Sequence, residues 1–149
     1  MFYLILPNIR SRYNVGSIFR TADVFGVDKI FLTGYTPTPP HSRISKVALG
    51  AEEMIPWEQH KQTGRLITKL RKEGVKIIAA EVTVDSQDYR KWKPKEPLAL
   101  VLGNEVTGLT KSILEKADHT IHIPMLGQKE SLNVSVTAGI LAAYIRQFT

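Results

Sequence analysis

The chain has 149 residues, 43% of them hydrophobic and 23% charged, so it is long enough to bury the core of one globular domain. It has no cysteine, which excludes disulfides, thiolate metal sites and a cysteine nucleophile, and its only N-terminal apolar run, Phe2 to Leu6, is too short for a signal peptide or membrane span. The net charge of +6 and the isoelectric point of about 9.6 favour a polyanionic partner, and we expect a soluble cytoplasmic protein without membrane association.

Strand and helix patterns alternate along most of the chain. In chain order they predict a strand at 2–6, a helix at 14–25, a strand at 29–33, a helix at 42–49, a strand at 54–57, a helix at 64–73, strands at 75–82 and 98–102, a helix at 110–117, a strand at 120–123 and a helix at 132–148. Several of these strands are uniformly apolar, which is typical of strands covered on both faces. The order therefore predicts an α/β domain with a largely parallel sheet.

Capping residues mark the ends of the main predicted helices. Asn14 is the predicted N-cap of the first helix, and Gly26 is the residue that ends it. Ser131 is the predicted N-cap of the last helix. The pair Glu52 and Glu53 is interpreted as a solvated helix end rather than an acid–base site.

The last helix, from Leu132 to Phe148, is apolar on nearly every side. Such a helix must be covered all round, so one face is expected to pack on the sheet and another on a second subunit. The polar loop from Met125 to Glu130 comes directly before it. This loop is either an ordinary corner or part of a cleft that presents backbone N–H and C=O groups.

Several chemistries are excluded by what the sequence lacks. Gly103 and Gly108 have the spacing of a phosphate-binding loop, but Leu109 stands where that motif requires lysine, so nucleoside triphosphate binding is not expected. The four histidines lack metal-ligand spacing, and no metal site is predicted. No G-x-S-x-G elbow is present, which argues against a serine hydrolase.

Three segments in order resemble a known family. They are NVGSIFRTADVFG at 14–26, LVLGNEVTGL at 100–109 and IPMLGQKESLNVSV at 123–136. Together they resemble motifs 1, 2 and 3 of the SpoU (TrmH-type) RNA ribose 2′-O-methyltransferases of the SPOUT superfamily. The resemblance covers nearly the whole chain and implies one SPOUT domain over residues 1–149 with no separate RNA-binding domain.

The resemblance also implies a fold and a cofactor. The fold is a parallel-sheet αβα sandwich with a C-terminal deep trefoil knot, although knots are rare among proteins in general. The cofactor is S-adenosylmethionine. Carried over to this chain, its pocket is formed by Leu102, Gly103, Glu105, Ile123, Met125, Leu132 and Asn133.

The same resemblance assigns catalysis to Arg20, Asn14, Ser131 and Asn133. Arg20 would stabilise the forming ribose alkoxide, because arginine is a poor base and its guanidinium carries a permanent positive charge. Asn14 would orient Arg20 or the ribose. Each of the three polar residues also has a simpler role open to it: Asn14 and Ser131 as helix caps, and Asn133 as a polar group in a first helical turn.

The positive charge is concentrated in the N-terminal third. Residues 1–50 carry six lysines and arginines against two acidic residues, an excess of four. The expected RNA-binding residues are Arg10, Arg12, Arg20, Arg43 and Lys46. Two functions stay open: methylation of a ribose 2′-hydroxyl in tRNA or rRNA by a homodimer, or a non-catalytic RNA-binding or assembly protein on the same fold.

Overall fold

A seven-stranded parallel sheet forms the centre of the computed structural model, which covers residues 1–149. The strands are β1 (Phe2–Pro7), β2 (Lys29–Thr33), β3 (Trp57–His60), β4 (Lys76–Ala80), β5 (Gln87–Asp88), β6 (Leu98–Leu102) and β7 (His119–His122). They lie in the order β3-β2-β1-β6-β4-β7-β5, and every pairing is parallel. The carboxyl ends of all strands therefore lie along one edge of the sheet.

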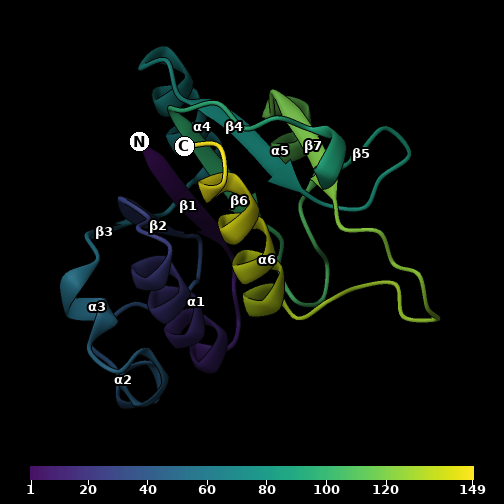
Figure 1. The fold of residues 1–149 in the computed structure, drawn as a ribbon. Helices are drawn as coiled ribbons and strands as arrows, with labels where there is room; N and C mark the ends of the chain where they lie inside the picture. The colour runs from purple at the N-terminus through teal and green to yellow at the C-terminus, as the bar shows by residue number, and fades with distance from the viewer.

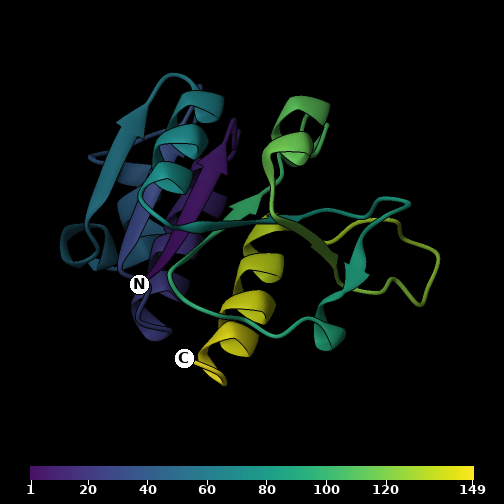
Figure 2. The same cartoon turned by 90° about the horizontal axis from the view of Figure 1, so that it is seen from above.

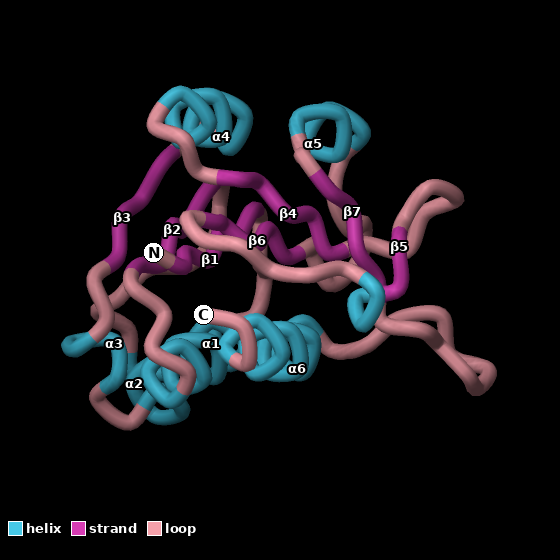
Figure 3. Tube along the Cα trace, turned by 45° about the horizontal axis from the view of Figure 1, so that its top comes forward, coloured by secondary structure: helices cyan, strands magenta, loops and turns pink.

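Helices cover both faces of this sheet. They are α1 (Arg12–Val24), α2 (Ser42–Ala48), α3 (Ala51–Met54), α4 (Thr63–Lys72), α5 (Lys111–Lys116) and α6 (Val134–Arg146), with a single 3₁₀ turn at Tyr89–Lys91. Figure 1 and Figure 3 show α1, α2, α3 and α6 on one face and α4 and α5 on the other. No helix is long and apolar enough to cross a membrane. The predicted parallel-sheet sandwich is confirmed, and the knot stays a prediction.

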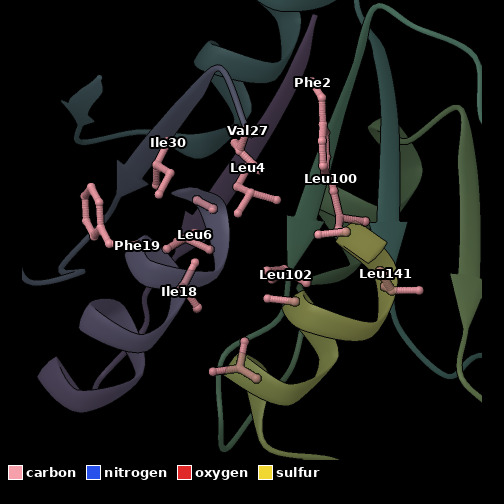
Figure 4. Packing of buried hydrophobic residues seen from close by; sticks show 14 of the residues in the cluster. Phe2, Leu4, Leu6, Ile18, Phe19, Val27, Ile30, Leu100, Leu102 and Leu141 are labelled. Carbon is pink, nitrogen blue, oxygen red and sulfur yellow. The ribbon is translucent and has the colours of Figure 1, made fainter. Parts of the chain in front are cut away.

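Alternation along β1 divides the core into two clusters. Phe2, Leu4 and Leu6 face α1 and α6, whereas Ile5 faces α4 and α5, as the two-residue period of a strand requires. Figure 4 shows the larger cluster, in which Leu141 of α6 lies beside the β6 residues. The two helical layers are thus held by separate apolar faces of the same strands.

The loop between β7 and α6 extends away from the body of the protein. Figure 2 shows this yellow-green segment projecting beyond the sheet edge. Within this loop, Leu126 is 93% exposed. The loop begins at the carboxyl edge of the sheet, so it leaves the core on the side where ligands bind in such folds.

The strand predicted at 54–57 is wrong. Residues Ala51–Met54 form the short helix α3, and the strand runs from Trp57 to His60, where it pairs with β2. Glu52 is also not solvated: it is 9% exposed, and its Oε2 has no hydrogen-bond partner. Packing of α3 against α1 buries it, which a helix-end pattern alone does not indicate.

Two predicted N-caps are wrong as well. Ser11 caps α1 by accepting a hydrogen bond from the Asn14 N–H at 3.2 Å, so Asn14 lies in the first turn. Asn133, rather than Ser131, caps α6 by accepting from the Ser135 N–H at 2.8 Å. The predicted end of α1 is confirmed, because Gly26 follows the C-cap with a φ of 62°.

Replacement by alanine should have opposite effects at two helical glycines, because only Gly16 lies at the close contact between α1 and α2. A Cβ at Gly16 would lie 2.5 Å from the Ile44 carbonyl oxygen, whereas one at Gly64 in α4 would lie 3.4 Å from the flexible end of Lys116. Gly16→Ala should lower the free energy of unfolding by about 1–3 kcal/mol through overpacking, and Gly64→Ala should raise it by up to about 1 kcal/mol. Urea unfolding measures both. A gain in stability for Gly16→Ala would contradict the close α1–α2 approach.

Candidate active site

A cavity of about 340 Å³ opens at the carboxyl edge of the sheet, where β4, β6 and β7 end. Half of its twenty lining residues are hydrophobic. Among the predicted cofactor residues, those that line it are Leu102, Gly103, Glu105, Ile123, Met125 and Leu132. Ser131 lines it too, whereas Asn133 does not. The size and the mixed lining are typical of a small-molecule site.

Glycines bring the loop after β6 close to the end of β4. Gly108 has a φ of 68°, and a Cβ there would lie 2.3 Å from Oε2 of Glu81. A Cβ at Gly103 would lie 3.1 Å from the same oxygen. That oxygen accepts a hydrogen bond from the Leu109 N–H at 2.9 Å. Glycine at 108 is therefore favoured by its positive φ, and a Cβ there would also displace the Glu81 carboxylate from the Leu109 N–H.

Asn104 fixes the same loop from within. It is 8% exposed, and its Oδ1 accepts hydrogen bonds from the backbone N–H groups of Val106, at 2.7 Å, and Thr107, at 3.0 Å. Its Nδ2 donates to the Asn8 carbonyl oxygen and, at 3.1 Å, to the Tyr35 hydroxyl. One buried amide thus ties the loop after β6 to the loops after β1 and β2.

A hydrogen-bonded junction joins the three sequence motifs. The Asn14 Nδ2 donates to Oε1 of Glu105 at 3.0 Å, and the Asn14 Oδ1 accepts from Nδ2 of Asn133 at 3.2 Å. The Glu105 carboxylate also accepts from the backbone N–H groups of Arg10, at 3.0 Å, and Ser11, at 3.2 Å. Because Ser11 takes the cap position, the Asn14 side chain is free to bridge the other two motifs.

These donors control the charge of Glu105. Burial alone would raise the pKa of its carboxyl group, but the hydrogen bonds from the Arg10 N–H, the Asn14 amide and the Ser11 N–H outweigh it. The net effect lowers the pKa of Glu105 below its ordinary value. At neutral pH the junction therefore contains a carboxylate.

A basic hollow of about 680 Å³ lies beside the junction. All five predicted RNA-binding residues line it: Arg10, Arg12, Arg20, Arg43 and Lys46. All five are exposed, and none forms a salt bridge. The remaining lining residues are Ser11, Tyr13, Val47 and Leu49. Cations from the α1 region and from α2, which are far apart in the sequence, thus lie on one surface.

Arg20 lines this hollow and does not line the cavity. The two spaces are nevertheless neighbours, because Glu105 lines the cavity and accepts hydrogen bonds from Arg10 and Ser11 of the hollow. The structure therefore places the four predicted catalytic residues in three places: Arg20 in the hollow, Ser131 in the cavity, and Asn14 and Asn133 in the junction between them.

Two polar residues that shape the site, Glu81 and Asn104, are among those that the sequence did not predict. Glu81 lines the cavity wall, and Asn104 organises the loop. Glu81 had a signal, since it is a charged residue directly after an apolar strand whose carboxyl end faces the site. Asn104 had a weaker one, the tendency of asparagine to hydrogen-bond the backbone of a turn. No group of three or more histidine and acidic side chains is placed to hold a metal ion.

The fold and the site define an α/β protein with a small-molecule cavity and an adjoining cationic surface at one edge of a parallel sheet. The sequence model of the SpoU rRNA Methylase family matches residues 1–143. The chain therefore belongs to the SpoU rRNA Methylase family.

Individual relatives agree with this placement. The chain is 34% identical over 140 residues to a putative TrmH family tRNA/rRNA methyltransferase, YacO, of Bacillus subtilis, covering 94% of this chain and 56% of that protein. It is 34% identical to the 23S rRNA (guanosine-2′-O-)-methyltransferase RlmB of Neisseria meningitidis, covering 97% of this chain and 57% of that protein. The chain spans just over half the length of these relatives.

A solved structure is similar over nearly the whole chain. The AdoMet-bound rRNA methyltransferase from Sinorhizobium meliloti superposes with a TM-score of 0.92 at 31% identity, covering 98% of this chain and 56% of that one. The parallel sheet and the helical layers therefore follow the architecture of that enzyme.

The junction carboxylate predicts an acid-dependent loss of stability. Because the pKa of Glu105 is lower in the folded state than in the unfolded state, its charge stabilises the fold above the unfolded value, and this contribution is lost as pH falls through the folded value. Because Glu105 is exposed and solvent screens its charge, Glu105→Gln should lower the free energy of unfolding by at most about 1 kcal/mol at pH 7, with the difference from wild type shrinking as pH falls below about 4.3, the ordinary pKa of a glutamate. Urea unfolding across pH measures this.

The matched control is Glu115→Gln. Glu115 is exposed and pairs only with Lys111, at 3.9 Å in an i,i+4 arrangement, so its change should stay below about 0.5 kcal/mol at every pH. A pH-independent loss for Glu105→Gln would show that shape rather than charge matters at the junction.

Proposed function

We propose that the chain transfers a methyl group from S-adenosylmethionine to a ribose 2′-hydroxyl of tRNA or rRNA. The observation that carries the proposal is the junction of Asn14, Glu105 and Asn133, which joins the three motifs between a small-molecule cavity and a cationic hollow. The names of the relatives, which include a guanosine-2′-O-methyltransferase, support the same reaction.

The cavity suits the cofactor. Leu102, Ile123 and Leu132 offer apolar surface for an adenine ring, and the glycine loop leaves backbone groups accessible beside them. When bound, S-adenosylmethionine supplies an activated methyl group on a sulfonium centre, which a ribose 2′-oxygen attacks. The proposed holding residues are Leu102, Gly103, Glu105, Ile123, Met125 and Leu132, with Asn133 supporting them through the junction.

The polar residues have separate proposed roles. Arg20 stabilises negative charge on the 2′-oxygen as its proton leaves, because a guanidinium carries a permanent positive charge. Asn14 and Asn133 hold the motif 1 helix against the start of α6, so that the hollow and the cavity keep a fixed distance. Ser131 lines the cavity and offers a hydroxyl there.

The basic hollow is the proposed RNA-binding surface. Its five exposed cations have no acidic partner, so phosphate groups are their natural counterions. The proposed substrate is tRNA or rRNA, as in the names of the relatives, and the proposed location is the cytoplasm. The alternative, a non-catalytic RNA-binding protein, would retain the hollow without a need for the cavity.

We also propose that residues 1–149 form one methyltransferase domain that acts as a homodimer. On α6, Val134, Ala138 and Leu141 are buried in the core, whereas Val136 is 47% exposed and begins a half-exposed apolar stripe with Ile140. A second copy of the chain would cover this stripe of α6, a helix that lies beside α1 on the same face of the sheet.

Two variants separate cofactor binding from transfer. The wild-type chain should bind S-adenosylmethionine without RNA at micromolar affinity, about −8 kcal/mol, by calorimetry. Gly103→Val should abolish binding, because even a Cβ there would lie 3.1 Å from Glu81 and from Gly108. Arg20→Ala should bind the cofactor normally but transfer methyl groups about 10²- to 10⁴-fold more slowly, because it loses only charge stabilisation.

Arg20→Lys is the matched control for charge. It should recover little activity if a planar, bidentate head is needed, and more if positive charge is sufficient. Absence of cofactor binding at millimolar concentration by wild type would favour the non-catalytic alternative. Normal turnover by Arg20→Ala would remove Arg20 from the reaction.

The dimer has its own measurement. Light scattering at micromolar concentration should give about twice the chain mass of 16.7 kDa. Val136→Lys should shift the protein towards monomer, because it puts a charge into the apolar stripe without touching the core. A wild-type mass of one chain would overturn the proposed dimer.

A further inference from the structure

The basic hollow contains more than cations. Tyr13 and Leu49 line it together with the five lysine and arginine side chains, and they are 62% and 66% exposed. A surface that binds only phosphates needs no apolar groups. Single exposed apolar side chains are common on proteins, but here two of them share one concave surface.

The Tyr13 ring has no partner within the chain. Its hydroxyl makes no hydrogen bond, and its ring is not part of any of the four aromatic pairs or either cation–π contact. It lies in the first turn of α1, between Arg12 and the junction residue Asn14. The ring is therefore held on a rigid element with its faces free to stack.

Leu49 is exposed at a conformational cost. Its φ of 54° and ψ of 41° lie in the left-handed region, which is sterically unfavourable for a residue with a side chain and where glycine is the usual residue. Gly50 follows with a φ of 91°, so the chain turns through two such residues. This turn ends α2 and holds the Leu49 side chain in the hollow instead of the core. Strained residues of this kind are concentrated at functional sites.

Whether an RNA is paired or unpaired decides whether its bases can contact Tyr13 and Leu49. An RNA duplex presents phosphates and riboses outward and keeps the faces of its bases stacked inside. An unpaired nucleotide exposes a flat base that stacks on an aromatic side chain. A duplex would use the cations and leave Tyr13 and Leu49 unused, whereas a single strand would use all of them.

We propose that the hollow binds one unstacked nucleobase of a single-stranded RNA segment, with the base stacked on Tyr13 and packed against Leu49 while the surrounding cations contact its flanking phosphates. This inference rests on the proposed RNA substrate and specifies its class: the site prefers loops and other unpaired segments to duplexes. Tyr13 and Leu49 are thus proposed as RNA-binding residues, in addition to the residues that were assigned roles from the three motifs.

The test uses a synthetic single-stranded RNA of about 12 nucleotides, the same strand annealed to its complement, and the same strand with abasic positions. Fluorescence anisotropy over a salt series gives the affinity of the full chain for each. Wild type should prefer the complete single strand. Tyr13→Ala should weaken binding of that strand by about 5- to 150-fold without changing the salt slope, and Tyr13→Phe should not.

Three further variants separate stacking from charge and from folding. Arg43→Ala should weaken single-strand and duplex binding alike and reduce the salt slope by about 0.7–0.9. Leu49→Gly should weaken only single-strand binding while its unfolding temperature stays equal to wild type or rises, because glycine relieves the left-handed strain. Val84→Ala removes a fully exposed apolar side chain outside the hollow and should change nothing.

Equal binding of the abasic and complete strands, or unchanged single-strand preference in both Tyr13→Ala and Leu49→Gly, would overturn the proposed base site. Calorimetry with S-adenosylmethionine and a methyl-transfer assay on total RNA are run on the same preparations. These two measurements report on the proposed reaction and not on the base site. If only the proposed base site is wrong, the wild-type protein will still bind S-adenosylmethionine and transfer methyl groups.

Discussion

The carboxylate of Glu105 is the interaction on which the arrangement of the site depends. Glu105 is exposed, yet its carboxylate oxygens accept hydrogen bonds from the backbone just before α1 and from Asn14 in the first turn of that helix. Motif 1 is therefore fixed against the loop after β6 by a charge rather than by apolar packing. Asn14 extends this constraint, because its amide donates to Glu105 and accepts from Asn133 at the start of α6.

The cavity depends on a second constraint, the close approach of two loops at one edge of a parallel sheet. β6 is the neighbour of both β1 and β4, so the loop after it can touch the ends of both. Asn104 supplies the contact towards β1, and Gly108 allows the contact with Glu81 after β4. A side chain at 108 would displace the Glu81 carboxylate and so break its hydrogen bond to the Leu109 N–H, even though position 108 lies outside the three-residue junction.

The sequence predicted elements well where the local pattern was sufficient. The strands at 29–33 and 98–102 were placed with their correct ends, because uniform apolar runs bounded by polar residues leave little choice. Asn14 was misplaced as a cap because Ser11 and Asn14 both suit that position. The deciding contacts of Asn14 reach residues 91 and 119 positions away, which no local pattern contains. The cavity residues were predicted from the family resemblance alone. The basic residues were predicted from the distribution of charge, but the hollow that they share could not be predicted from it.

Helix α1 explains why these features depend on one another. Gly16 and Arg20 are four residues apart and so lie about 40° from each other around the helix. Without a Cβ at Gly16, α2 approaches to contact distance, and this approach brings Arg43 of α2 beside Arg20 and places Leu49 at the end of the same helix. A larger residue at 16 would therefore widen the hollow as well as destabilise the core. The residue that sets the packing of the two helices thus also sets the spacing of the proposed RNA contacts, and the junction at Asn14 transmits that spacing to the cavity.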